Sequence, residues 1–261
     1  MGMERRLAVL VLGMLAGAAS GQVQKVKSMA KDAHPSYEVA TIKPSDPTDQ
    51  SSGFHSRERR IFIENEPMDQ LIAFAYSVHP KQIVDAPDWF AKDRWDIQGM
   101  PDIEGSPDVD QEREMLRKLL AERFQLKFHR DKRELSIFAI TVAKGGPKLA
   151  ASKSDPDVMR DQTMNGNGVE DDYRFTNNSM AGFAEGMEFL LDRPVVDETG
   201  LKGKYDFDLK WTVDGTPPQT DPNAPPGFFT AVQEQLGLKM KATKGPAEVL
   251  VIDHAERPSA N

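Results

Sequence analysis

The stretch PMDQLIAFAYSVHPKQIVD at 67–85 matches SMAGFAEGMEFLLDRPVVD at 179–197 at an offset of 112 residues, and this match organises the whole chain. In the first, Pro67 is well placed to begin a helix, and the apolar side chains after it recur on one helical face. Met68 corresponds to Met180, and both stretches end in Val-Asp. The spacing predicts an amphipathic helix followed by a short segment, twice.

The match between the two parts of the chain continues beyond these stretches. Residues 126–128 (LKF) correspond to 238–240 (LKM) at the same offset, and 94–97 (RWDI) correspond to 204–207 (KYDF) at an offset of 110. One offset relates a helix, a helix-to-strand junction and a strand of the first part to their counterparts in the second. This regularity predicts a tandem duplication. The alternative is a coincidence between two generic amphipathic patterns.

The order of the elements predicts an α+β fold. Each of two related halves has the order strand-helix-strand-strand-helix-strand-strand, with its helices packed on mixed or antiparallel sheets. The second helix of each half is expected at 111–124 and 228–236, and a strand, a turn and a final strand follow each one. The expected boundaries are a signal peptide at 1–21, a flexible lead-in at 22–36, a first half at 37–146, a linker at 147–172 and a second half at 173–261.

Three polar stretches, at 45–60, 144–172 and 213–227, predict loops because Gly, Pro, Ser, Asp and Asn accumulate there. Part of the second stretch, 161–172, nearly has the spacing of a calcium loop. However, its twelfth position is Asp172 rather than Glu. A plain polar linker is therefore the simpler interpretation.

Composition excludes several classes of protein. The 261 residues carry 33 Lys and Arg against 41 Asp and Glu, a net charge of −8, and the pI is near 5.2. A nucleic-acid coat or a binder of anionic membranes needs clustered positive charge, so neither is expected. The absence of cysteine excludes disulfides, thiolate zinc sites, cysteine nucleophiles and an acylated lipoprotein cysteine.

The N-terminus has the pattern of a secretory signal. Arg5 and Arg6 precede the apolar run at 7–15, and small residues follow at 16–21. The alternative is a membrane anchor, but this run is shorter than the roughly 20 apolar residues that a span requires. Cleavage after Gly21 removes one acid and two bases, which leaves a net charge of −9. We expect a soluble, secreted or periplasmic protein without a membrane span after cleavage.

Several long motifs of the chain are familiar: YEVATIKPS at 37–45, PDWFAKDRWDI at 87–97, LLAERFQLKFHR at 119–130 and RPVVDETGLKGKYDFDLKW at 193–211. Through them, residues 37–259 resemble a large paralogous family of exported soil-bacterial proteins, chiefly acidobacterial, catalogued as a domain of unknown function. Related sequences form the extracytoplasmic part of some beta-lactam-sensor-type metallopeptidases, which implies sensing or binding by analogy only.

Four residues are candidates for ligand binding. Trp89 and Phe90 follow Pro-Asp in a predicted loop and suit an exposed aromatic anchor, although packing of the loop onto the core is the simpler interpretation. His129 and Arg130 begin the run HRDKRE at 129–134, which is predicted to form a turn between two strands. This turn binds an anion in one interpretation and is a solvated hairpin in the other.

No catalytic, metal or cofactor site is expected. None of the five histidines lies two or four residues from another, and the chain has no Gly-x-Ser-x-Gly, Walker or Gly-x-Gly-x-x-Gly motif. Asp96 and Asp206 occupy matching strand positions, and paired carboxylates suit acid–base work. A capping or ion-pairing role beside Arg94 and Lys204, once in each half, is simpler.

We therefore expect a binding or sensor-like interaction module of the cell envelope, with an unknown protein, peptide or glycan as its partner. The alternative is a secreted hydrolase with dispersed active-site residues. A third interpretation is a structural envelope component that works through its sheet edges. A pocket that converges on several titratable groups favours the enzyme, whereas a shallow apolar groove or an open sheet edge favours binding.

Overall fold

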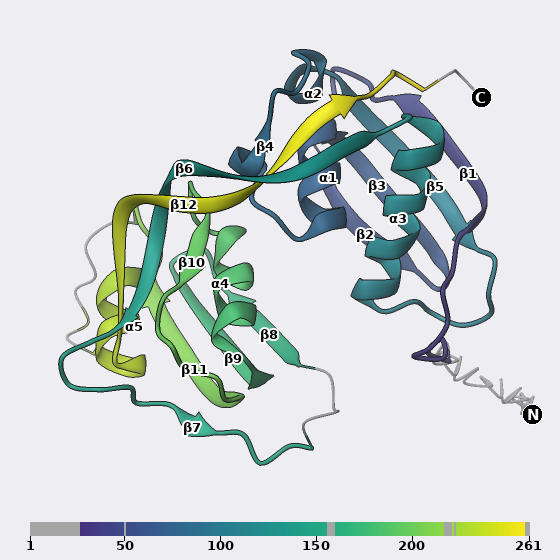
Figure 1. Ribbon diagram of the computed structural model, residues 1–261. Coiled ribbons are helices and arrows are strands. Elements are labelled where there is room, and N and C mark those ends of the chain that lie inside the picture. Colours follow the sequence, from purple (N-terminus) through teal and green to yellow (C-terminus); the bar gives the residue numbers. More distant parts are fainter. Residues whose placement is uncertain (1–26, 50, 156–159, 217–220, 222, 259–261) are drawn as a thin grey trace, which may run out of the picture.

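The computed structural model describes residues 27–49, 51–155, 160–216, 221 and 223–258. The chain forms two lobes that are joined by a long pair of antiparallel strands (Figure 1). Helices and mixed or antiparallel sheets make up both lobes, which confirms the α+β class. No helix within the described ranges is long and apolar enough to cross a membrane. The signal peptide expected at 1–21 lies outside these ranges.

Lobe 1 is a four-stranded sheet with helices on one face (Figure 1). Alternate residues of the central strands, such as Ile61, Ile63 and Ile97, are buried under the helices, as the period of a half-buried strand requires. The sheet order is β1 (Tyr37–Pro44), β5 (Arg94–Pro101), β3 (Arg60–Pro67) and β2 (Gly53–Arg57), and the helical segments are α1 (Met68–Tyr76), η1 (Pro80–Gln82), α2 (Trp89–Lys92) and α3 (Val109–Arg123).

Lobe 2 has the same arrangement with corresponding elements. Its core is strongly aromatic, with Phe175 stacked on Phe207 at 4.7 Å and Phe183 edge-on to both. The sheet order is β7 (Ala150–Ala151), β11 (Tyr205–Thr212), β9 (Glu170–Asn178) and β8 (Asp161–Gly166), and the helices are α4 (Met180–Glu188) and α5 (Phe228–Leu236). The equivalent strands therefore follow the same order as in lobe 1.

Each of the two joining strands begins in one lobe and ends in the other, so the lobes exchange strand ends. β6 (Lys127–Val142) pairs antiparallel with β12 (Leu238–His254) along nearly its whole length. The C-terminal part of β6 adds Phe138 to the core of lobe 2, and that of β12 adds Leu250 to the core of lobe 1. A short parallel strand completes each end: Val195 of β10 (Val195–Asp197) pairs with Phe138, and Ile83 of β4 (Ile83–Val84) pairs with Leu250. Both pairings obey the 112-residue offset, while the duplication as an event stays a prediction.

The turn predicted at 129–134 is wrong, because these residues lie inside the continuous strand β6 and pair with β12. The same holds for the turn expected in the second half, where β12 runs unbroken from 238 to 254. The middle of this two-stranded ribbon is exposed and rich in charge. A ribbon without a buried face shows no alternation of apolar and polar residues, so its sequence resembles that of a turn.

Two predicted loops also contain strands. β2 lies within 45–60, and β8 with the start of β9 lies within the linker expected at 147–172. β2 and β8 are edge strands with mostly polar, partly exposed residues. Sequence patterns detect such strands poorly because few of their residues are buried.

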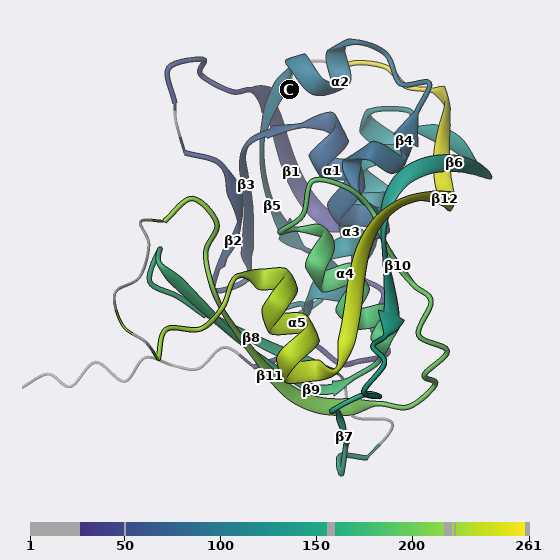
Figure 2. The same ribbon diagram turned by 90° about the vertical axis from the view of Figure 1, so that its left-hand side faces the viewer.

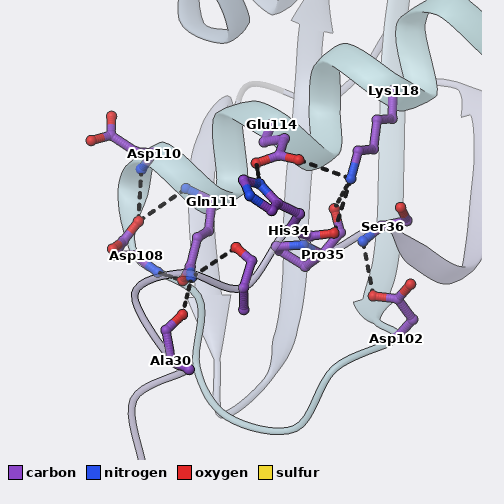
Figure 3. Close-up of polar contacts among 11 residues, drawn as sticks. Ala30, His34, Pro35, Ser36, Asp102, Asp108, Asp110, Gln111, Glu114 and Lys118 are labelled. Atoms are coloured by element: carbon purple, nitrogen blue, oxygen red, sulfur yellow. Dashed lines mark hydrogen bonds and ion pairs between the residues drawn. The ribbon is translucent and has the colours of Figure 1, made fainter.

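The lead-in expected to be flexible lies beside α3 at Ala30, His34 and Pro35 (Figure 3). Gln111 donates through Nε2 to the carbonyl of Ala30 at 2.7 Å. Lys118 donates through Nζ to the carbonyl of His34 at 3.0 Å. Polar side chains of α3 thus satisfy backbone carbonyls of this segment, while its flexibility stays a prediction.

Candidate ligand-binding cleft

A cavity of about 460 Å³ lies between the lobes, and we call it the interlobe cleft. Lobe 1 supplies one wall through the first turns of α3, and lobe 2 supplies the others through α4 and β8. The lining side chains are Val109 and Arg113 from α3; Arg160, Asp161, Gln162 and Met164 from β8 and the residue before it; Tyr173 from β9; and Gly182, Glu185, Gly186, Phe189 and Leu190 from α4 and the turn after it.

The interlobe cleft concentrates exposed apolar side chains. Six large apolar residues are exposed in the described part of the chain, and four of them, Val109, Met164, Phe189 and Leu190, line this one cavity. Phe189 and Met164 are 66% and 61% exposed. Such a cluster is costly to leave in water and marks interaction sites on soluble proteins.

An ion-pair cluster forms the floor of the interlobe cleft. Glu185 lies 2.9 Å from the guanidinium of Arg113 and 2.6 Å from that of Arg160. The Arg113 side chain is only 8% exposed and also contacts Asp110 at 3.2 Å. Its guanidinium carbon lies 5.6 Å from the centre of the Phe74 ring. Glu185 therefore joins the lobes through a nearly buried arginine.

Two helical glycines bring β8 close to α4. A Cβ atom at Gly182 would lie 2.5 Å from an Nη atom of Arg160, and one at Gly186 would lie 2.9 Å from Oε1 of Gln162. Because 182 and 186 are one turn apart, they face the same way. Because neither glycine has a side chain, this face of α4 allows Arg160 to reach Glu185, and it sets the width of the cleft.

A second hollow of about 390 Å³, the His79 pocket, adjoins the interlobe cleft and shares Glu185 and Phe189 with it. It contains the titratable groups of His79, Lys81, Glu185, Glu188 and Asp192. Burial raises the pKa of Glu188 to about 7, and the nearby charge of Glu185 adds to this effect. The pocket thus has the convergence of titratable groups that an enzyme would show.

The hydrogen bonds of this pocket nevertheless restrain its groups. The Nδ1 atom of His79 accepts from the backbone N–H of Lys81 at 3.0 Å, and Nε2 lies 3.3 Å from the carbonyl of Leu191. Burial lowers the pKa of His79, which favours the neutral ring. With Nδ1 an acceptor and Nε2 a donor, neither ring nitrogen is free to exchange a proton with a substrate.

The aromatic pair predicted as an anchor lies away from the interlobe cleft, in α2 at the far end of lobe 1 (Figure 1). Phe90 is 2% exposed and belongs to the core of lobe 1. Trp89 is half-buried, and the guanidinium carbon of Arg257 lies 5.3 Å from its ring centre. Of the two, only Trp89 presents part of its ring to solvent.

His129 and Arg130 lie on the ribbon between the lobes. Nδ1 of His129 is 2.9 Å from Asp253, and Arg130 forms an ion pair with Glu248. Each side chain therefore has a neighbouring carboxylate that reduces its attraction for an anion. Arg130 borders a further hollow that also contains Glu185 and Glu188. The structure brings none of the four predicted residues into the interlobe cleft.

Sequence reasoning missed the residues of the interlobe cleft. Phe189, Leu190 and Met164 have no motif, and an apolar residue at the end of an amphipathic helix usually belongs to the core. The available signal was the pair Gly182 and Gly186, which is unusual inside a helix. Across the described ranges, no group of three or more His, Cys, Asp or Glu side chains is placed to hold a metal ion.

Together, the fold and the cleft define a two-lobed α+β protein with a cavity between its lobes. Residues 69–255 match the model of the family described as "Protein of unknown function (DUF3738)", and the chain belongs to this family. No curated protein and no solved structure matches the chain.

Proposed function

We propose that this protein is a binding module, sensor-like in role, that holds a partner in the interlobe cleft. The observation that carries the proposal is the convergence of Val109, Met164, Phe189 and Leu190 on one cavity. Its volume of about 460 Å³ falls in the range of ligand pockets, roughly 300–1,000 Å³. Apolar walls above a charged floor bind a partner by burying its apolar groups and orienting its polar ones.

Binding is favoured over catalysis by the state of the titratable groups. His79 has both ring nitrogens engaged, and Glu188 accepts from the backbone N–H of Val195 at 3.0 Å. These contacts leave His79 without a free lone pair, whereas Glu188 is held through Oε1 alone and keeps its second oxygen. A catalytic base needs a lone pair that is free to face the substrate.

The raised pKa of Glu188 is the observation that favours the rival function, a hydrolase. We expect no turnover of chromogenic ester, glycoside or peptide substrates by this protein. Turnover that Glu188→Gln abolishes, and that the exposed-site variant Glu122→Gln leaves unchanged, would establish the hydrolase instead.

Export to the cell envelope is part of the same proposal. Its support is the charged, apolar and small-residue pattern at 1–21, together with the resemblance to extracytoplasmic parts of membrane-bound peptidases. N-terminal sequencing of protein recovered from an expressing bacterium should find Gln22 as the first residue. A chain that keeps the sequence of 1–21 would contradict export by cleavage.

A fragment screen observed by protein NMR tests the binding function. We expect aromatic and aliphatic fragments to shift the amide signals of Met164, Phe189 and Leu190, because these side chains form the apolar wall. Phe189→Ser should abolish the shifts. The matched control is Val39→Ser, since Val39 is 64% exposed but lies outside the interlobe cleft. Fragments that bind equally well to both variants, or none that bind at the cleft, would refute the proposal.

A further inference from the structure

β8 has a free side that faces the interlobe cleft. It is the last strand in the order β7-β11-β9-β8 (Figure 2), and Asp161, Gln162 and Met164 line the cavity. Its sequence, DQTMNG, contains neither Lys nor Pro, the residues with which edge strands are commonly protected. An edge strand of this kind offers a row of backbone donors and acceptors to an extended chain.

The side chains along this edge form a row on the helix-covered face of the sheet. Gln162 pairs with Phe175, and Met164 pairs with Tyr173. Phe175 and Tyr173 are buried beneath the helices, and paired residues project to the same face. Gln162 and Met164 therefore point toward α4. A strand added outside β8 would place every second side chain beside them, within the interlobe cleft.

Gly166, at the end of this row, has no side chain to cover the neighbouring carboxylate of Asp171. It pairs with Asp171 of β9, and an Oδ atom of Asp171 lies 2.3 Å from where a Cβ of Gly166 would stand. The carboxylate thus extends across the glycine toward the free edge. Among the described residues Asp171 forms no ion pair, so its charge is available to a cation on an added strand.

We propose that the partner is an extended peptide that adds to β8 as a further strand. An apolar residue of the peptide lies beside Met164 and contacts Phe189, and a Lys or Arg two positions along lies beside Gly166 and pairs with Asp171. This inference rests on the proposed function, because it names the class of molecule that the interlobe cleft holds. The recognition pattern is apolar-x-basic, with the period of two of a β-strand.

Selection from a phage-displayed library of linear peptides on the full chain tests the inference. We expect enrichment of apolar-x-Lys and apolar-x-Arg sequences, and binding of the corresponding synthetic peptide measured by fluorescence anisotropy. N-methylation of one alternate set of its backbone amides should weaken binding about tenfold or more, and methylation of the other set should not, since only one set faces β8.

A pair of variants tests the basic position. Asp171→Asn should weaken binding of the peptide about fivefold and reduce its salt dependence. Asp172→Asn is the matched control, because Asp172 pairs with Asn165 and so projects from the opposite face of the sheet.

The outcomes separate this inference from the proposed function. Peptides that need Phe189 but are insensitive to both N-methylation sets and to Asp171→Asn would overturn strand addition and leave the binding function intact. A library that yields no Phe189-dependent peptide would also overturn it, and a long-chain amphiphile found by the fragment screen would then be the occupant. Failure of the fragment screen itself would overturn both.

Discussion

The backbone N–H of Asn65 on β3 donates to the carboxylate of Asp96 on the neighbouring strand β5 at 3.0 Å, and Asn65 has a positive φ of 53°. Lobe 2 contains the same relationship: Asn177, also with a φ of 53°, donates to Asp206 at 2.8 Å. In both lobes the asparagine side chain donates 3.1 Å to a loop carbonyl. The aspartates at matching positions thus secure the backbone just before α1 and α4.

Substitution of these asparagines tests the role of the left-handed backbone. Asn65→Ala should lower the free energy of unfolding by about 2 kcal/mol, because a Cβ without a compensating hydrogen bond is strained at positive φ. Asn65→Gly should cost about half as much, since glycine accepts this conformation. Asn177 should show the same order in urea unfolding followed by tryptophan fluorescence. Equal effects of Ala and Gly would show that backbone strain is not the cause.

The exchanged strand ends predict that neither half folds alone. A fragment of residues 37–146 lacks Leu250, which is fully buried in the core of lobe 1. The same fragment contains Phe138 but not the lobe 2 core into which this side chain packs. Each half expressed separately should therefore show no cooperative thermal transition by circular dichroism, whereas the two halves together should form a complex that melts cooperatively. Two halves that each melt cooperatively as monomers would contradict this.

The sequence predicts those parts of the fold in which burial leaves a periodic pattern. The helix begun by Pro67 and the helix expected at 228–236 both have a buried face, and both are present. The ribbon around Arg130 and the edge strand around Met164 escaped prediction, because their stability comes from pairing with strands distant in sequence. A period of two is visible only where one face is buried.

The candidate site was unpredictable for a related reason. The interlobe cleft lies where Arg113 of α3 contacts Glu185 of α4 in the other lobe, and nothing in the sequence near either residue records this contact. Trp89 and Phe90 were candidates for ligand binding because they are aromatic, yet Phe90 belongs to the core of lobe 1. The type of a residue indicates what it is able to bind, but its position relative to the other lobe decides whether it is available.

The ion pair between the lobes should respond asymmetrically to substitution. Glu185→Gln leaves the nearly buried Arg113 with only the exposed Asp110, so we expect a loss of about 2 kcal/mol in unfolding free energy. Arg113→Met leaves Glu185 paired with Arg160 and should cost less than half of that. As a surface control, Asp208→Asn breaks the exposed pair with Arg174 and should cost less than about 1 kcal/mol. A larger loss for Arg113→Met than for Glu185→Gln would refute this account.

Two glutamates should make the protein less stable as the pH rises. Burial raises the pKa of Glu188 to about 7, with a contribution from Glu185, and burial raises that of Glu112 to about 7, with a contribution from Asp108. An unfolded glutamate titrates near 4.5, so the folded state binds these protons more tightly. The stability that this provides is complete below about pH 4.5 and is lost as the pH rises through about 7.

Urea unfolding at pH 5 and pH 8 measures this loss, which we expect to be on the order of 1–2 kcal/mol for each group after allowance for partial exposure. Glu188→Gln and Glu112→Gln cannot ionise and should each reduce the difference between the two pH values. Glutamine at 188 keeps an oxygen to accept from the N–H of Val195, so the loop is retained. The exposed control Glu122→Gln should keep the full difference. A pH dependence that neither variant changes would place the responsible groups elsewhere, because removal of an ionisable side chain removes its own contribution to the linkage.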